Sequence, residues 1–153
     1  IGRGSGHIVN ISSLAGVIGM FGYTAYSGAK FAVKGYTDVL RSEMKPYGVD
    51  VSCVFPPDTD TPQLAWENQF KPFETHMIAG SDKPFPAEKV AKSIVLGVQK
   101  NKYIIVPGLE AKLFYFLATH LGGLVYTVLD ILVKNAIKKK VAVQGAQTEK
   151  HSR

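Results

Sequence analysis

Two short apolar runs flank a long helical pattern near the start of the chain, and this arrangement restricts the fold more than any other feature. The runs cover residues 7–12 and 49–55. Neither alternates as a half-solvated strand does, and continuous apolar runs are typical of strands buried on both faces of a parallel sheet. A third run follows at residues 103–106. The sequence therefore predicts an α/β fold with a parallel sheet and right-handed crossovers.

Residues 24–45, between the first two runs, have the periodicity of one long helix. Thr24 is its predicted N-cap, and Pro46 ends it. A second helix is predicted over residues 86–100. Residues 56–85 are rich in proline and aromatic residues, and long irregular segments of this kind usually carry function. The first helix should bury one apolar stripe, formed by Ala29, Ala32, Val33, Tyr36, Leu40 and Met44.

The charge of the chain is concentrated at its C-terminal end. The 153 residues carry 18 Lys and Arg against 12 Asp and Glu. Residues 134–153 hold six of these basic side chains and a single acid, so the rest is nearly neutral. We therefore expect no nucleic-acid partner, and a tail that meets an anionic surface such as lipid. The single cysteine, Cys53, lies in the second apolar run, where it reads as a reduced core thiol, and no metal site is expected.

Three polar residues, Ser13, Tyr26 and Lys30, could act together. Tyr26 and Lys30 are four residues apart on the predicted helix, so they lie on neighbouring turns. Ser13 ends the first strand, where α/β sheets place reactive groups. An ammonium near a phenol lowers its pKa, and such a phenol can protonate a carbonyl oxygen while a hydride reaches the carbon. The serine hydroxyl can hold the same oxygen.

Residues 6–16 and 26–32, GHIVNISSLAG and YSGAKFA, resemble the short-chain dehydrogenase/reductase family. The resemblance implies a Rossmann-type doubly wound sheet over residues 1–108 and a nicotinamide cofactor. It also implies that Ser13 orients the carbonyl, that Tyr26 is the acid and base, and that Lys30 holds the cofactor ribose and tunes Tyr26.

The residues after the second strand extend the resemblance. The family usually reads Pro-Gly-x-Val-x-Thr there, and this chain reads PPDTDT from Pro56 to Thr61. The resemblance implies cofactor contacts from Pro56, Thr59 and Thr61, together with Tyr26 and Lys30. Pro57 replaces the glycine and removes a backbone N–H, so a contact that depends on glycine is in doubt.

Longer stretches, residues 43–47, 56–62 and 67–75, are most similar to the family members that reduce long-chain 3-keto sphingoid bases with NADPH. Other lipid or steroid reductases of the family are the alternative. Residues 62–80 would then form a lid. Its apolar side chains either line a channel for an alkyl chain or roof the core, and they are Leu64, Trp66, Phe70, Phe73, Met77 and Ile78. A substrate ammonium could meet Glu67 or Glu74.

The glycine-rich phosphate loop that the family carries is not found in this sequence, which begins at Ile1. We therefore expect the C-terminal half of a longer reductase, and little cofactor binding or activity from these residues alone. The alternative is a truncated, non-catalytic membrane or dimerisation module. In the family the helix that bears Tyr26 often packs against its copy, so a homodimer is also expected.

Residues 113–133 are strongly apolar, with 15 apolar residues among 21, and a lysine-rich flank follows. As one helix this stretch would just span a bilayer. Polar residues at 120, 127, 130, 134 and 138 form one stripe, which favours a helix lying in the interface or a hairpin bent at Gly122 and Gly123. A single span and a helix packed on a protein partner are the alternatives. We expect residues 109–140 to contact membrane lipid and residues 141–153 to be disordered, with the catalytic part on the cytosolic face of the endoplasmic reticulum.

Overall fold

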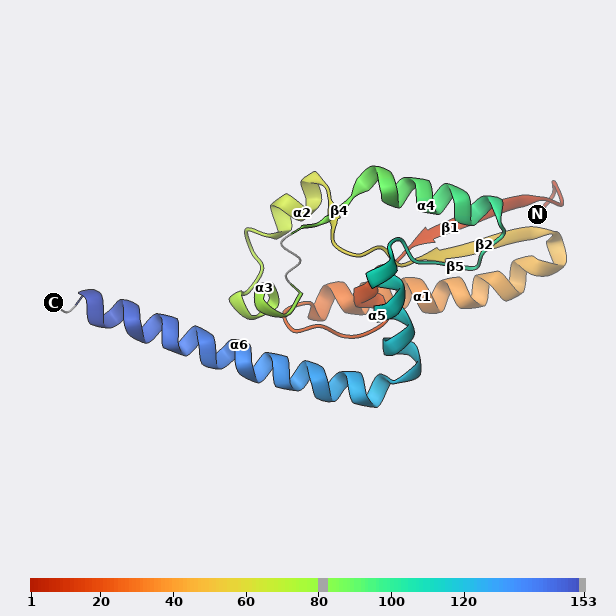
Figure 1. The fold of residues 1–153 in the computed structure, drawn as a ribbon. Helices are drawn as coiled ribbons and strands as arrows, with labels where there is room; N and C mark the ends of the chain where they lie inside the picture. The colour runs from red at the N-terminus through yellow and green to blue at the C-terminus, as the bar shows by residue number, and fades with distance from the viewer. Residues whose placement is uncertain (80–82, 152–153) are drawn as a thin grey trace.

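The computed structural model describes residues 1–79 and 83–151, and its centre is a three-stranded parallel sheet (Figure 1). The strands are β1 (Gly6–Ile11), β2 (Val49–Val54) and β5 (Ile104–Ile105), in the order β1-β2-β5. In the first pair Ile8 lies opposite Val51, and in the second Val54 lies opposite Ile105. All three predicted strands are confirmed: β1 begins one residue early with the predicted length, and β2 and β5 are shorter than their apolar runs. No residue of β1 is fully buried, so the predicted burial of this strand is wrong.

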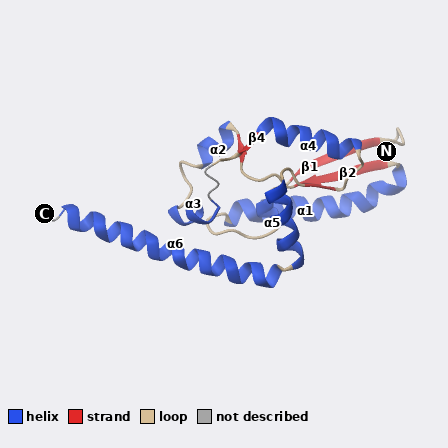
Figure 2. Cartoon of the chain, in the orientation of Figure 1, coloured by secondary structure: helices blue, strands red, loops and turns tan. Residues whose placement is uncertain are grey.

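Helices cover both faces of this sheet (Figures 1 and 2). The long helix α1 (Thr24–Met44) lies on one face and α4 (Ala87–Gln99) on the other. Because the strand order advances in one direction while the two helices lie on opposite faces, both crossovers cannot be right-handed. The prediction of right-handed crossovers is therefore wrong for one of them. That rule derives from short β-α-β units, and the connection from β2 to β5 is about fifty residues long.

Helix α1 follows the predicted stripe only in part: Val33, Leu40 and Met44 are half-buried, whereas the other three residues of the stripe are exposed. Tyr36 is 63% exposed, whereas Ser27 and Thr37 are the buried residues of the helix. The Thr37 hydroxyl donates to the Val33 carbonyl at 2.6 Å and accepts from the Asn10 side chain at 3.0 Å. A polar residue can therefore occupy the most buried position, because its hydrogen bonds are satisfied.

The two ends of α1 differ in how well the sequence predicts them. Its N-cap is Tyr23, without a side-chain cap, and Thr24 is already helical, so the predicted Thr24 cap is wrong. At the other end the chain tightens into a 3-10 turn, η2 (Lys45–Tyr47), which contains Pro46. Gly48 then reverses the chain with a φ of 67°, a conformation that favours glycine.

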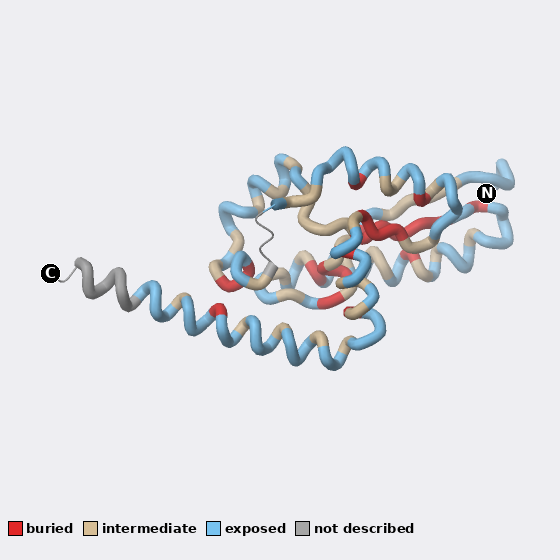
Figure 3. Tube along the Cα trace, in the orientation of Figure 1, coloured by how far each residue is buried: buried red, intermediate tan, exposed pale blue. Residues whose placement is uncertain are grey.

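The core lies between β2, β5 and the start of α5 (Leu109–His120) (Figure 3). Cys53 and Phe55 are fully buried, and the Phe55 ring packs against Tyr115 of α5 at 5.1 Å between centroids. Because Cys53 is a free and buried thiol, the prediction of a core thiol is confirmed. Burial also raises the pKa of this thiol.

Residues 56–85 contain more regular structure than predicted. Two short helices, α2 (Pro62–Glu67) and α3 (Phe73–Ala79), lie between two short strands, β3 (Thr59–Asp60) and β4 (Phe85–Pro86). The two strands pair in parallel. Elements of two to seven residues are too short to show a hydrophobic period, which is why the sequence predicts only a loop here.

The apolar C-terminal segment is bent. Helix α5 ends at His120, and α6 (Gly122–His151) leaves it at an angle of 113°. Within the described residues, no single helix is long and apolar enough to cross a membrane. Taken together, α5 and α6 have sufficient length and apolar composition, but they form a bent pair. The break falls next to the predicted Gly122 hinge, and it separates His120 from the rest of the polar stripe.

Two of the predicted boundaries in this region need correction. The segment predicted to start at residue 109 is not separate from the core, because Ala111 and Ala118 of α5 are buried against the rest of the protein. Nor does the chain lose regular structure at residue 141, because α6 continues to His151. No proline interrupts residues 134–151, and alanine, lysine and glutamine there favour helix.

Candidate active site

The two adjacent serines after β1 point in different directions. Ser12 is buried and donates its hydroxyl to the Lys30 carbonyl of α1 at 2.8 Å. Ser13 caps the 3-10 turn η1 (Leu14–Gly16), where its hydroxyl accepts from the Ala15 N–H at 3.2 Å. Ser13 lines a cavity and Ser12 does not, so the structure brings the predicted serine to the cavity wall.

Tyr26 and Lys30 lie one turn apart on α1. The Lys30 Nζ atom is 5.5 Å from the centre of the Tyr26 ring and donates to the Ile11 carbonyl at 3.3 Å. The Tyr26 side chain shares the cavity wall with Ser13, which lies close enough to the phenol to act on its pKa. The structure therefore brings together all three residues of the predicted group.

Close packing of η1 against α1 makes this arrangement possible. A Cβ atom on Gly16 would collide with the Ser12 hydroxyl oxygen and would lie 2.8 Å from the Lys30 carbonyl oxygen. Only glycine allows the turn to approach the helix this closely. Gly16 therefore fixes the distance between the end of β1 and the helix that carries Tyr26.

The electrostatic surroundings of Tyr26 differ from the expectation. Burial raises the pKa of its phenol, the nearby Ser13 hydroxyl opposes this rise, and the charges of Glu67 and Asp58 add to it. The prediction that Lys30 lowers this pKa is not supported, because burial dominates and the Lys30 ammonium is hydrogen-bonded to the Ile11 carbonyl. The phenol is therefore held in its neutral form, which can donate a proton.

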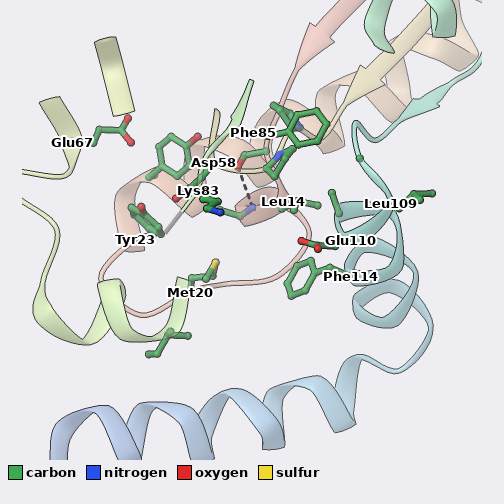
Figure 4. Close-up of a pocket in the computed structure, with 18 of the residues that line it drawn as sticks. Leu14, Met20, Tyr23, Asp58, Glu67, Lys83, Phe85, Leu109, Glu110 and Phe114 are labelled. Atoms are coloured by element: carbon green, nitrogen blue, oxygen red, sulfur yellow. Dashed lines mark hydrogen bonds between the residues drawn. The ribbon is translucent and has the colours of Figure 1, made fainter. Parts of the chain in front are cut away.

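The cavity beside this group has a volume of about 650 Å³ (Figure 4). Its wall includes Ser13 and Tyr26, residues 56–58 after β2, Glu67 at the end of α2 and Phe85 of β4. The start of α5 closes another side through Leu109, Glu110, Ala111 and Phe114. The sequence assigns these α5 residues to the membrane segment, because an apolar pattern alone does not distinguish a protein neighbour from lipid.

A second polar group lies beside the cavity, and sequence reasoning missed it. The Lys71 side chain is 6% exposed, and its Nζ atom lies 3.1 Å from an Asp58 carboxylate oxygen and 5.9 Å from the centre of the Tyr23 ring. Burial raises the pKa of the Tyr23 phenol, and the nearby Lys71 ammonium opposes this rise. The only signal in the sequence is a lysine inside an aromatic segment, which does not predict burial.

The predicted cofactor residues after β2 are only partly at the cavity. Pro56 lines it, whereas Thr59 and Thr61 do not. The Thr59 hydroxyl donates to the Pro57 carbonyl at 2.8 Å. The Thr61 hydroxyl donates to the Thr59 carbonyl at 3.2 Å and accepts from the Leu64 N–H at 3.2 Å. These two hydroxyls stabilise the local turn and the start of α2, so the cofactor roles of Thr59 and Thr61 stay predictions.

The lid side chains are arranged differently from the prediction. The five at Leu64, Trp66, Phe70, Phe73 and Met77 do not line the cavity, although Ile78 does. Trp66 and Phe70 are 62% and 66% exposed and pack on each other at 4.9 Å between ring centroids. The short helix α2 turns its aromatic side outward and its Glu67 side toward the cavity. Glu74 lies outside the cavity wall and pairs with Lys140 of α6 at 2.8 Å.

A family model described as short chain dehydrogenase matches residues 1–71. The 3-ketodihydrosphingosine reductase of Dictyostelium discoideum is 43% identical over 132 residues, which are 86% of this chain and 40% of that protein. The Bos taurus protein of the same name is 52% identical over 93 residues, or 61% of this chain and 28% of its own length. The chain thus spans less than half the length of these relatives.

The fold is also similar to solved structures. A short chain dehydrogenase from Burkholderia cenocepacia, solved in complex with NADP, has a TM-score of 0.67, with 17% identity over 82% of this chain and 47% of that one. This likeness shows the fold. The resemblance found in the sequence is confirmed by the sequence matches: residues 1–71 match the short chain dehydrogenase model, and 132 residues match the Dictyostelium reductase.

Proposed function

We propose that this chain forms the carbonyl-protonating part of an NADPH-dependent reductase that converts 3-ketodihydrosphingosine to dihydrosphingosine. The observation that carries the proposal is that Ser13 and Tyr26 lie together at the wall of a 650 Å³ cavity, with Ser13 acting on the Tyr26 phenol. A neutral phenol next to a hydroxyl suits a reaction that must hold a carbonyl oxygen and give it a proton.

NADPH, when bound, supplies a hydride to the carbonyl carbon. The residues of this chain handle the oxygen: Ser13 holds it by a hydrogen bond, and the Tyr26 phenol donates its proton to it. The carbonyl thus gains a hydride and a proton and becomes a secondary alcohol, while NADPH becomes NADP⁺. The Lys30 ammonium donates one of its three N–H groups to the Ile11 carbonyl. The other N–H groups could donate to a ribose hydroxyl of the cofactor.

The substrate assignment rests on the relatives. Proteins named 3-ketodihydrosphingosine reductase from Dictyostelium discoideum and Bos taurus are 43% and 52% identical over the matched residues. Their names supply the substrate, and the apolar wall of Leu14, Met20 and Phe114 suits an alkyl chain. Another lipid or steroid ketone is the competing assignment within the same chemistry.

The test uses a chimera that carries this chain in place of the matching part of the Dictyostelium reductase. We expect NADPH oxidation with 3-ketodihydrosphingosine and slower turnover with a ketosteroid. Equal or faster steroid turnover would overturn the substrate assignment. No turnover of any ketone, in a chimera that is folded by circular dichroism, would overturn the reductase assignment. The 153-residue chain is assayed in parallel, with little activity expected.

We also propose that α5 and α6 contact membrane lipid. Their large apolar side chains are exposed, with Leu113 at 60%, Leu124 at 61% and Ile131 at 53%. Four lysines between residues 134 and 140 follow these side chains and suit an anionic surface. The chain should float with anionic vesicles, and replacing Leu113, Leu124 and Ile131 by Ser should abolish flotation. Flotation unchanged by these substitutions would contradict the proposal.

The cellular location and the oligomeric state stay predictions. Cell fractionation should place the protein in the endoplasmic reticulum membrane, with the catalytic part open to added protease on the cytosolic side. The exposed α1 residues Phe31, Tyr36 and Val39 suit a second copy of the chain. Sedimentation should then show a dimer that Tyr36→Glu dissociates, and a monomer at all concentrations would exclude it.

A further inference from the structure

Glu67 is a carboxylate at the cavity wall whose charge is not neutralised by a cation. It is the last residue of α2 and lines the cavity together with Ser13 and Tyr26. Its Oε1 atom accepts from the Gln63 side-chain amide at 2.6 Å, a neutral donor. Among the ion pairs of residues 1–79 and 83–144, none includes Glu67. The amide fixes the carboxylate without cancelling its charge.

The other acids that the structure describes in this region are paired with lysines or belong to a different wall of the cavity. Asp58 is paired with the buried Lys71, and Glu74 is paired with Lys140 outside the cavity wall. Glu110 does line the cavity, but it starts α5, across the cavity from Glu67 (Figure 4). Of the carboxylates that act on the Tyr26 phenol, Glu67 has the largest electrostatic effect. It is therefore the acid best placed to meet a group beside the reacting carbonyl.

Lys89 of α4 also lines the cavity. Like charges repel, so this lysine disfavours a substrate ammonium beside α4.

We propose that Glu67 binds the ammonium group of an amino ketone substrate, and thereby selects substrates whose amine is on the carbon next to the carbonyl. The inference rests on the proposed function. In 3-ketodihydrosphingosine the amine is bonded to the carbon adjacent to the ketone, so a carbonyl held by Ser13 and Tyr26 brings the ammonium to the same part of the cavity. A charge-assisted hydrogen bond to a carboxylate is roughly twice as strong as one between neutral groups. A neutral ketone of equal length gains nothing from Glu67.

Binding to the 153-residue chain tests this without requiring turnover. The ligands are dihydrosphingosine, which carries the ammonium, and octadecane-1,3-diol, which lacks it, each presented in the same detergent micelles. Isothermal titration calorimetry measures the binding of each ligand. Wild type should bind the amine about tenfold more tightly than the diol, which is the size of effect that hydrogen bonds to charged groups produce.

Glu67→Gln should abolish this preference by weakening the amine alone. Glu110→Gln, a second cavity carboxylate, is the matched control and should keep the preference. The proposal is overturned if wild type binds both ligands equally or neither, if Glu67→Gln keeps the preference, or if Glu110→Gln loses it. A preference that depends on Glu67, in a protein whose chimera reduces no ketone, would instead support Glu67 and overturn the reductase assignment.

Discussion

The rings of Tyr23 and Tyr26 lie 5.4 Å apart between centroids, at an angle of 45°, and both line the same cavity. Their phenols nevertheless have different partners. Ser13 acts on the Tyr26 phenol, and the Lys71 ammonium acts on the Tyr23 phenol. Only one of these two neighbouring tyrosines is therefore equipped to share a carbonyl oxygen with a serine.

Tyr26→Phe should lower the turnover of the chimera by about 10²-fold or more, the range for loss of a general acid. Tyr23→Phe is the matched control, because it removes the same hydroxyl from the adjacent ring of the same cavity. We expect less than about tenfold loss from it. Steady-state NADPH oxidation measures both. Turnover of Tyr26→Phe within a few-fold of wild type would exclude Tyr26 as the proton donor.

The pH dependence of reduction should follow the raised pKa of Tyr26. Because the phenol must be protonated to donate, kcat/KM should hold through neutral pH and fall only above about pH 10, the ordinary value for tyrosine. Glu67→Gln removes a negative charge that raises this pKa, so it should move the alkaline limb to lower pH. An alkaline limb that stays in place in Glu67→Gln would show that the limb belongs to another group.

Gly16→Ala should destabilise the chain by about 1–3 kcal/mol, the usual cost of overpacking, because the new methyl meets Ser12 and the Lys30 carbonyl. Gly35→Ala is the control. Gly35 lies inside α1 with open space around it, so alanine there should stabilise by about 0.5–1 kcal/mol. Urea unfolding measures both, and a Gly16→Ala chain as stable as wild type would contradict the close packing of η1 on α1.

Asp38 should make the stability of the chain sensitive to acid. Partial burial opposes its ionisation, but hydrogen bonds from Lys34 and Tyr103 hold the pKa of this carboxyl below its usual range. Its stabilisation is therefore complete above about pH 4 and is lost as the pH falls through the lowered folded-state pKa. Asp38→Asn should be less stable than wild type at neutral pH, by about 1 kcal/mol or less, and equal to it in strong acid.

The control for this experiment is Asp50→Asn, an exposed position on β2. Its urea midpoint should match that of wild type at both pH values. A difference between Asp38→Asn and wild type that persists unchanged in strong acid would mean that the side-chain shape of Asp38, and not its charge, stabilises the fold.

The ion pair between Glu74 and Lys140 should hold α6 against α3. Its atoms are 2.8 Å apart, and the Glu74 side chain is only 8% exposed, so its carboxylate has little water to replace the lysine. Lys140→Ala should speed hydrogen exchange in residues 134–144 of α6, whereas Lys139→Ala, an exposed neighbour, should not. Equal hydrogen exchange in both variants would show that apolar packing through Ala136 is sufficient to hold α6 against α3 without the ion pair.

Much of the sheet and of the site could be predicted because its signals are local. The apolar runs fix β1 and β2 within a residue or two, and Pro46 marks the end of α1. Ser13, Tyr26 and Lys30 are predicted because their spacing places them at a strand end and on adjacent turns, within two stretches that resemble the family. Such signals do not depend on the rest of the fold.

The predictions that failed concern side chains whose burial depends on contacts with residues that are distant in the sequence. Thr37 is fully buried because Asn10, far away in sequence, donates to it, and no periodicity shows this. Lys71 is buried because Asp58 and Tyr23 surround its ammonium. The apolar side of α5 covers the core at Ala111 and Ala118, which hydropathy alone does not distinguish from a lipid contact.

Helix α5 separates the cavity from the outside by the thickness of a single helix. Ala111 and Phe114 face the cavity, while Leu113 and Phe116 are 60% and 53% exposed. With a bilayer against that outer side, as we propose, the tail of a lipid substrate can remain in hydrocarbon while its head group reaches Tyr26. Turnover should then follow the mole fraction of substrate within the bilayer, as in surface-dilution kinetics, rather than its total amount per volume of solution.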